Sequence, residues 1–460
     1  MSAPQRNFLA LATGEVGSRV LGFAATALLA RRVGADGFGI LGFALAVTSY
    51  LIVPGLSLQD VAAREVAKQP SAVARIASGV VRARILLAIL QIAVAYALVL
   101  LLPKPPATRA IVALSTIVLI PLSLNTSWAY KALERTTLVA QSLFLVQLVY
   151  LVGVVLFVHT SSDVGRVPVI QAAGEMAAAL MLLPIARGGW VASSLREGLA
   201  TLRGGALATV SRYMRALTVT GDVVLVSILM SDRAVGLYSA AYRVCFLLTA
   251  IAVSAHVVFI APLTRARDRI DDANAVLVRS VHLAWLAVFP LVIGGMLVAP
   301  DLLAFMFGEE FRDGATAFRL LLASIGVYAL QGAVRNVFVV QNRMDIDARI
   351  NGVAAFLNIA CNLVVIPRYG LAGAATVMVL TEMVVLIATS VVLVRWGWRV
   401  PVLTLWRPTV AVVPMSLALL ALPFALPVAA RIAMAGGVLL ITLWMLGEWR
   451  VATSGLRPND

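Results

Sequence analysis

The sequence predicts an all-α polytopic membrane protein with about fourteen transmembrane helices. Hydrophobic residues make up 61% of the 460 positions, and the mean hydropathy is +0.96. Charged residues make up only 13%, about half the share of a soluble globular protein. Apolar runs long enough to cross about 30 Å of hydrocarbon recur along the whole chain. These observations exclude a disordered chain, a soluble enzyme and a nucleic-acid-binding protein, in spite of the formal net charge of +15.

The apolar runs define the expected spans in order. The first, 8–30, is too long for the apolar region of a signal peptide, so we expect it to stay as a helix. Prolines 414, 423 and 427 interrupt the thirteenth run, which neighbouring helices can tolerate within a membrane. The fourteen expected helices begin near Phe8, Phe38, Ile85, Ala110, Thr137, Pro168, Ser211, Gly236, Leu277, Ala317, Ala348, Leu371, Pro408 and Ala429.

The distribution of Lys and Arg predicts the orientation. With the N-terminus in the cytoplasm, most basic residues fall at cytoplasmic loops and helix ends, as the positive-inside rule requires. The outer loop 301–313 is acidic. We therefore expect a multi-pass protein of the inner (cytoplasmic) membrane with both termini in the cytoplasm. The two clearest inner clusters are Arg64, Lys68, Arg75, Arg82 and Arg84, and Arg265, Arg267, Arg269 and Arg279.

A weak internal repeat predicts two lobes. Shifting the sequence by 197 residues lays 38–44 on 235–241, and both segments open the second helix of a half. Six spans separate the copies, so the halves would be parallel repeats about an axis along the membrane normal, with a central cavity between them. We expect an N-terminal lobe with a cytoplasmic amphipathic linker at 1–205, a second six-helix lobe at 206–400, and two further helices with a cytoplasmic tail at 401–460.

Charged residues inside the spans are the candidate functional groups, because each costs about 2.5–3.5 kcal/mol at the membrane centre on insertion scales. In helix 1, Glu15, Ser18 and Arg19 share one polar face with Gly22 and Thr26. Two interpretations of Arg19 stay open. It faces a cavity, or it forms a structural ion pair with Glu15 one turn away.

Helix 7 repeats this pattern with Arg215, Thr218 and Asp222 on one face. Glu382 is near the midplane of helix 12, where a structural and an ion-coupling role are both open, and Arg319 and Arg335 are near enough to helix ends to reach the interface. The candidate substrate-binding residues are Arg19, Glu15, Ser18, Arg215, Arg243 and Arg335. The candidate coupling-ion residues are Asp222, Glu382 and Glu175. The three histidines lack metal-ligand spacing, and no phosphate-binding glycine motif occurs, so we expect no metal, cofactor or catalytic residue.

Several ordered motifs resemble those of the oligosaccharide (O-antigen type) flippases of the multidrug/oligosaccharidyl-lipid/polysaccharide exporter superfamily. The resemblance covers most of residues 8–395, and the first-helix stretch is also similar to that of the peptidoglycan lipid flippases. In those proteins a first-helix arginine serves the cavity, which by resemblance assigns that role to Arg19. The motifs are 17–23, 29–34, 37–39, 64–67, Asp222, 236–243, 307–311 with 319–321, 358–363, 366–375 and Glu382.

The resemblance implies a V-shaped pair of six-helix lobes with alternating access. It implies a non-enzymatic flippase that carries an undecaprenyl-diphosphate-type lipid-linked oligosaccharide to the outer leaflet. The partners to expect are that substrate, membrane lipid, polysaccharide assembly proteins and H⁺ or Na⁺ as coupling ion, with no nucleic acid. A cation-coupled multidrug antiporter, a membrane polymerase or glycosyltransferase, and a non-transporting scaffold remain as alternatives.

Overall fold

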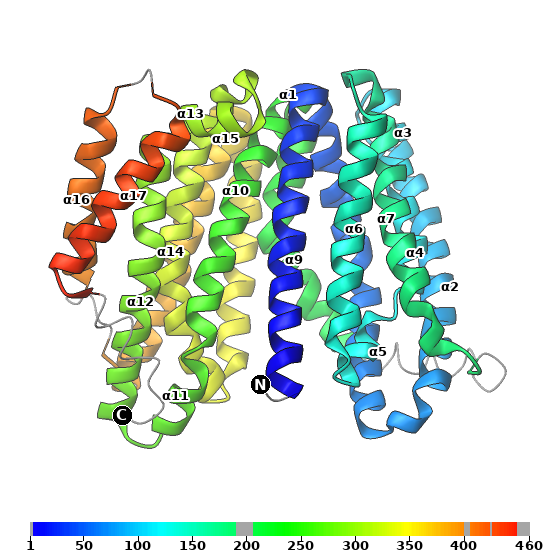
Figure 1. The fold of residues 1–460 in the computed structure, drawn as a ribbon, viewed down its shortest axis with the longest axis horizontal. Coiled ribbons are helices and arrows are strands. Elements are labelled where there is room, and N and C mark those ends of the chain that lie inside the picture. Colours follow the sequence, from blue (N-terminus) through cyan, green and yellow to red (C-terminus); the bar gives the residue numbers. More distant parts are fainter. Residues whose placement is uncertain (1–2, 190–205, 400–404, 424–425, 449–460) are drawn as a thin grey trace. The chain divides into compact units, whose positions relative to one another are not determined.

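The computed structural model describes residues 3–189, 206–399, 405–423 and 426–448, and all regular structure in these ranges is helical. Figure 1 shows the long helices of the chain running up and down in the view. Short 3₁₀ segments (η) connect or extend several of them. The α-helices are α1 (Ala3–Lys68), α2 (Val73–Leu100), α3 (Pro106–Ser115), α4 (Leu119–Leu124), α5 (Ser127–Ala132), α6 (Thr136–Phe157), α7 (Val167–Leu182), α9 (Ala206–Leu229), α10 (Asp232–Val257), α11 (Ile260–Ala266), α12 (Ile270–Leu297), α13 (Ala299–Phe307), α14 (Ala315–Val340), α15 (Met344–Arg395), α16 (Trp406–Ala421) and α17 (Val428–Met445). The 3₁₀ segments are η1 (Pro70–Ala72), η2 (Thr116–Val118), η3 (Ser161–Arg166), η4 (Leu183–Ala186) and η5 (Glu309–Gly314).

The described residues contain ten helices that are long and apolar enough to cross a membrane. Shorter apolar helices occupy 220–229 and 406–421. The two longest helices each contain one glycine with a non-helical backbone, Gly34 (φ 72°, ψ 179°) in α1 and Gly370 (φ 58°, ψ −143°) in α15. A side chain would be strained at these positive φ values. Each glycine therefore divides its helix into two segments, which in α1 are 3–33 and 35–68.

The region predicted as one helix from Ala110 is a broken helix. It consists of α3, η2 and α4, and the chain then leaves the helix at Asn125 (ψ 119°) before α5 begins. A helix end inside a membrane needs donors for its last carbonyls, because no water is present to satisfy them. Arg84 of α2 supplies these donors: one guanidinium nitrogen donates to the Asn125 carbonyl (2.8 Å) and another to the Leu122 carbonyl.

Arg84 has a structural role that its place in the predicted inner cluster of basic residues does not suggest. It lies within α2 and is 6% exposed. α2 begins at Val73, about three turns before the apolar run becomes continuous, so Arg75 and Arg82 are helical residues as well. The orientation stays a prediction.

Contacts between Cα atoms divide the chain into two compact units, unit 1 at Met1–Gly236 and unit 2 at Leu237–Asp460. The predicted lobes divide the chain earlier, at 205/206. The difference arises because α9 packs on α1 and so belongs to unit 1. The lobe boundaries stay a prediction, and most of the predicted amphipathic linker at 188–205 lies outside the described residues.

Two ion pairs fasten the last helices to unit 2. Arg431 of α17 is 3% exposed and donates to the Asp301 carboxylate (2.9 Å), which also accepts from Arg312 (2.8 Å). Past the other end of α17, the carboxylate of Glu448 lies 2.6 Å from Nε2 of His282 on α12. Because Glu448 is 1% exposed, this contact is buried. Both pairs join groups more than 120 residues apart in the sequence.

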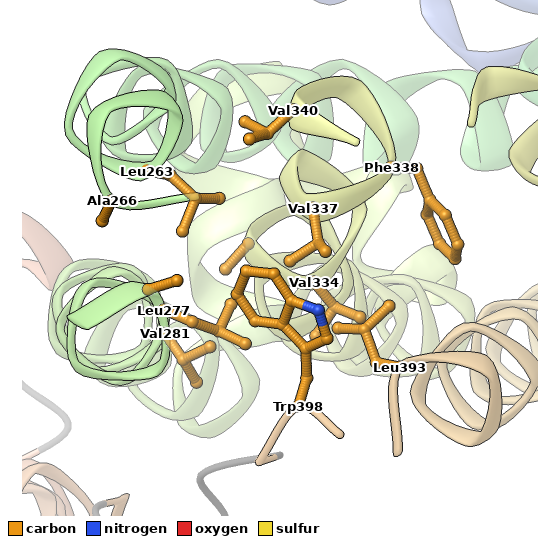
Figure 2. Close-up of a cluster of buried hydrophobic side chains, with 12 residues drawn as sticks. Leu263, Ala266, Leu277, Val281, Val334, Val337, Phe338, Val340, Leu393 and Trp398 are labelled. Carbon is orange, nitrogen blue, oxygen red and sulfur yellow. The ribbon is translucent and has the colours of Figure 1, made fainter. Parts of the chain in front are cut away.

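An apolar cluster holds one end of unit 2 together. Figure 2 shows the Trp398 indole among the side chains of Leu277, Val281, Val334 and Leu393. These residues come from α12, α14 and the end of α15, so the cluster joins helices distant in sequence. Transferring a large apolar side chain of this kind from water to the protein interior stabilises the fold by about 1.5–3 kcal/mol.

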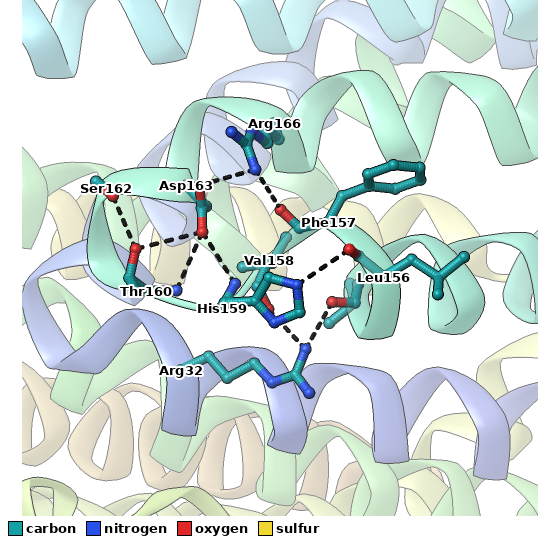
Figure 3. A network of polar contacts seen from close by, with 10 residues as sticks. Arg32, Leu156, Phe157, Val158, His159, Thr160, Ser162, Asp163 and Arg166 are labelled. Carbon is teal, nitrogen blue, oxygen red and sulfur yellow. Dashed lines mark hydrogen bonds and ion pairs between the residues drawn. The ribbon is translucent and has the colours of Figure 1, made fainter.

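An arginine closes the end of α6 in unit 1. Arg32, at the end of the first α1 segment, donates to the carbonyls of Val154 (2.9 Å), Val155 (3.0 Å) and Val158 (2.6 Å). Figure 3 shows the Arg32 guanidinium beside Val158. The last carbonyls of a helix need such donors because the helix itself supplies too few. Arg166 does the same for the Phe157 carbonyl (2.9 Å). Arg32 thus ties the end of the first α1 segment to α6.

Candidate functional site

The polar face of helix 1 is divided in the structure. Gly14 and Gly22 pack against α6, since a Cβ on Gly14 would lie 2.7 Å from that of Ala140, and one on Gly22 would lie 2.6 Å from Oε1 of Gln147. Ser18 shares this face at the same four-residue spacing and is buried (7% exposed). Arg19, one residue further, is exposed. Helix 1 therefore separates the two adjacent candidates, with Ser18 in a helix–helix contact and Arg19 outside it.

Asp222 lies at the contact between α9 and the second segment of α1. It is 2% exposed, and its Oδ1 accepts a hydrogen bond from the amide of Val223 (2.8 Å). Tyr50 approaches from α1: its hydroxyl is hydrogen-bonded to the side chain of Thr220 and interacts electrostatically with Asp222. The Tyr50 hydroxyl also lies beside Gly221, at 3.7 Å from the position that a Cβ would take, which is an ordinary van der Waals distance.

Two ion pairs accompany this contact in unit 1, one between α1 and α9 and one between the loop before α3 and the start of α10. Near the predicted cytoplasmic end, Arg212 of α9 pairs with Asp60 of α1, and their side chains are 39% and 47% exposed. At the predicted outer end, Lys104 donates to Asp232 at the start of α10 (2.7 Å), with side chains 8% and 17% exposed. Thr108 donates to the other carboxylate oxygen of Asp232 (3.0 Å). The outer pair is therefore buried and additionally hydrogen-bonded, whereas the inner pair is open to its surroundings.

A backbone crossing accompanies the outer ion pair. A Cβ on Gly39 would overlap the Asp232 carbonyl and lie 2.8 Å from the Gly236 amide nitrogen. Conversely, a Cβ on Gly236 would overlap the Ala35 carbonyl and lie 3.1 Å from the Gly39 amide nitrogen. Only glycine allows two helix backbones to approach this closely. Gly39 and Gly236 are equivalent positions of the 197-residue repeat.

A second polar group lies within unit 2, where α14 faces α15. Arg335 of α14 is bidentate to Asp347 of α15 (2.8 and 2.7 Å), and Asn351 donates to the same carboxylate (3.1 Å). Asp347 is 4% exposed. A bidentate, charge-assisted pair of this kind is strong and directional. The Arg335 guanidinium therefore already has a carboxylate partner in the same unit.

Glu382 lies near this pair. It is 8% exposed, its carboxylate is hydrogen-bonded to Gln331, and it interacts electrostatically with Arg335. One residue before it, Thr381 accepts a hydrogen bond from the Asn358 amide (3.0 Å), and Asn358 in turn accepts from Asn362 (3.0 Å). The structure thus brings together Arg335 and Glu382, two candidates that the sequence places 47 positions apart.

For the remaining candidates, the structure gives only the burial of the residue or does not describe the side chain. Glu175 on α7 is half-buried, and Arg243 on α10 is exposed. The side chains of Glu15 and Arg215 lie outside the described residues, so the predicted Glu15–Arg19 pair stays a prediction, as do the assigned roles. In the described part of the chain, no cluster of three or more His, Cys, Asp or Glu residues could hold a metal ion.

Sequence reasoning missed Tyr50, Lys104, Arg84 and Asp347. Tyr50 is an ordinary aromatic residue of an apolar run, and Lys104 stands in a proline-rich loop. Their importance comes from partners 128 to 172 positions away, which a single sequence does not identify. Asp347 had a usable signal, because an acidic residue 12 positions after Arg335 and just past a helix boundary is a plausible partner for it.

Comparison with known proteins adds a family and a fold. The profile of the polysaccharide biosynthesis protein family matches residues 5–263, more than half of the chain. A protein of Haloferax volcanii described as a probable flippase, AglR, is 26% identical over 165 residues, 35% of this chain. The alignment spans about a third (34%) of that relative's own length. These matches confirm the resemblance to the flippase family that the motifs predicted.

Two solved structures share the fold. The lipid II flippase MurJ in an inward closed conformation superimposes with a TM-score of 0.76 at 12% identity, covering 96% of this chain and all of that one. An inward-facing multidrug resistance transporter of the MATE family, in the MOP superfamily, gives a TM-score of 0.66 at 14% identity, with 82% and 93% covered. At these identities the likeness is one of fold. An all-helical membrane transporter fold is therefore shown for this chain.

Proposed function

Because the chain belongs to the polysaccharide biosynthesis protein family, we propose that it is a flippase for a lipid-linked oligosaccharide. The proposed substrate is of the undecaprenyl-diphosphate type, moved from the cytoplasmic to the outer leaflet. The sugar and diphosphate would need a polar path through the membrane, whereas the prenyl chain can stay in lipid. Membrane lipid and polysaccharide assembly proteins are the proposed partners, with H⁺ or Na⁺ as coupling ion.

We further propose alternating access by two six-helix lobes, in an inner membrane with both termini cytoplasmic. The ten long helices and the two shorter apolar ones of the described residues give fourteen spans if α1 and α15, each divided by a glycine, count as two spans each. The reciprocal Gly39–Gly236 contact supports the repeat, because a two-fold axis between equivalent helices produces such a mutual contact. In this arrangement the substrate must bind the inward-open and outward-open states unequally for transport to follow.

The observation that carries the substrate assignment is the exposed Arg19, about halfway along the first α1 segment. Its neighbour Ser18 is buried, so the exposed and the buried candidate are adjacent on this segment. A guanidinium is suited to a diphosphate because its planar donors engage two phosphate oxygens at once.

The test is transport by the purified protein in proteoliposomes. Undecaprenyl-diphosphate oligosaccharide with a radiolabelled sugar is placed in both leaflets, and the fraction cleaved by an impermeant glycosidase is followed over time. We expect cleavage to proceed beyond the initially accessible half in vesicles with protein. Cleavage that stops at half, together with protein-dependent ethidium movement in the same vesicles, would favour the multidrug antiporter. Cleavage that stops at half without ethidium movement would favour the scaffold or the membrane enzyme.

A further inference from the structure

The second segment of α1 runs antiparallel to α9 and the start of α10 across the full thickness of a membrane. The contacts occur at three levels: Gly39 with Asp232, Tyr50 with Gly221, and Asp60 with Arg212. From one contact to the next, the residue number rises along α1 and falls by nearly the same amount along α9 and the start of α10, as in an antiparallel pair of helices. Twenty-one helical residues span about 31 Å, close to the hydrocarbon thickness of about 30 Å. We call this set of three contacts the α1–α9 seam.

The three levels of the seam differ in strength. The outer level combines interlocked glycine backbones with the buried Lys104–Asp232 pair. At the inner level, the side chains that the structure describes form one ion pair, between groups that are 39% and 47% exposed, and exposed ion pairs are weak. Whatever holds the middle level therefore decides how readily the inner end separates. That level consists of the Tyr50 hydroxyl, the Thr220 side chain and Asp222.

We propose that Tyr50 is a positioning residue that links the charge on Asp222 to closure of the inner end of the α1–α9 seam. The Tyr50 hydroxyl lies beside Gly221, next to the buried Asp222, and it interacts electrostatically with that carboxylate. A phenol dipole near a buried carboxylate is held more strongly while the carboxylate is charged, because electrostatic interactions are strong where water is absent. Thr220, two residues before Asp222, fixes the hydroxyl from the same helix. Neutralising Asp222 weakens the middle level, and the inner end of the seam then opens more readily.

This inference rests on the proposed function for its meaning in transport, but its structural part has a separate test. Cysteines replace Asp60 and Arg212 in a chain with Cys245→Ala and Cys361→Ser, and the rate of copper-catalysed disulfide formation is measured in membranes. Because the ion pair is absent from every variant, its loss cancels in the comparison. The variants compared are Tyr50→Phe, Asp222→Asn, the two together, and the control Tyr96→Phe, whose ring is 50% exposed on α2.

We expect Tyr50→Phe and Asp222→Asn each to slow disulfide formation about threefold or more. The double variant should be no slower than the slower single variant, because both changes break one link. Thr220→Val removes the hydrogen-bond partner of the Tyr50 hydroxyl on α9, so its disulfide should form at the same rate as in Tyr50→Phe. This variant decides the question if Tyr50→Phe fails to insert into the membrane. A Tyr50→Phe rate equal to that of Tyr96→Phe, or effects that multiply in the double variant, would overturn the proposal.

The transport readout uses the flipping assay with imposed proton or sodium gradients, on variants that keep Asp60 and Arg212. Tyr50→Phe should reduce the acceleration that a gradient gives, whereas Tyr96→Phe should leave it as in wild type. A loss of packing alone would lower the rate with and without the gradient by the same factor, which would count against positioning. If the wild type does not flip the oligosaccharide, the proposed function fails, and the disulfide rates still decide the role of Tyr50.

Discussion

Gly39 and Gly236 occupy each other's side-chain space: a Cβ on either would press on the backbone of the other helix, 2.8 or 3.1 Å from the partner's amide nitrogen. The relation is mutual, and it joins the two positions that the internal repeat makes equivalent. Neither backbone can move aside without moving its whole helix. The two helices are thus held close together at the predicted outer end of the α1–α9 seam. This close contact requires glycine at both positions.

Alanine at either glycine should therefore destabilise the protein. Overpacking a tight contact costs about 1–3 kcal/mol, so Gly39→Ala and Gly236→Ala should each lower the apparent Tm in detergent by several degrees. Gly352→Ala is the matched control, because nothing lies within 4 Å of a Cβ there. Equal apparent Tm values for Gly39→Ala and Gly352→Ala would contradict a close backbone contact at Gly39.

Removing one member of the Lys104–Asp232 pair should cost more than removing both. Lys104→Met leaves the partly buried Asp232 carboxylate without its ammonium partner, and the loss should lie below the roughly 3–5 kcal/mol of a fully buried pair. Adding Asp232→Asn removes that charge, so the double variant should recover most of the lost stability. Thermal unfolding of the four proteins gives the coupling. If the single losses simply add, the two side chains do not depend on each other.

Replacing Arg19 should stop flipping without preventing membrane insertion. Arg19→Lys keeps the charge but loses the planar donor geometry, so we expect at least a tenfold lower rate, and Arg19→Ala should abolish flipping. Arg319→Ala is the control, because Arg319 is also exposed and contacts a carbonyl near a helix end, that of Met296 (3.0 Å). Restored activity in the double variant Glu15→Gln, Arg19→Gln would show that Arg19 only neutralises Glu15.

Neutral replacements of the candidate carboxylates should change ion coupling without changing stability. Asp222→Asn and Glu382→Gln keep the side-chain size, so each should preserve folding while reducing the response of flipping to an imposed pH or Na⁺ gradient if it couples. Glu175→Gln, at a half-buried position, is tested in parallel. Normal gradient responses in all three variants would remove these residues from coupling.

The orientation can be tested with single cysteines in a Cys361→Ser background. Asp36 is exposed and Ser162 lies in an exposed turn, so cysteines there should react with an impermeant thiol reagent added to intact cells. Cysteines at Gln69 and Asp268, also exposed, should react only after permeabilisation. Labelling of the second pair in intact cells would reverse the predicted topology.

Composition and apolar periodicity were sufficient to predict an all-helical membrane protein, because lipid permits few other structures. They could not predict the broken helix before α5, since that break depends on donors from Arg84, about 40 positions earlier. The candidate charges were recognised individually, but the pairing of Arg335 with Asp347 was not predicted, and the substrate-binding role of Arg335 stays a prediction. Tyr50 shows the remaining limit most clearly, because its role depends on which helix it meets.

The fastening of α17 has a consequence for how the protein is made. Arg431 and Glu448 come from the last part of the chain that the structure describes, yet they complete contacts with Asp301 and His282. A ribosome reaches both of them only after all other described helices have been synthesised. Unit 2 therefore cannot complete these two contacts during translation of its earlier helices. A nascent chain stalled before residue 431 should be recognised by membrane quality-control proteases as unfinished.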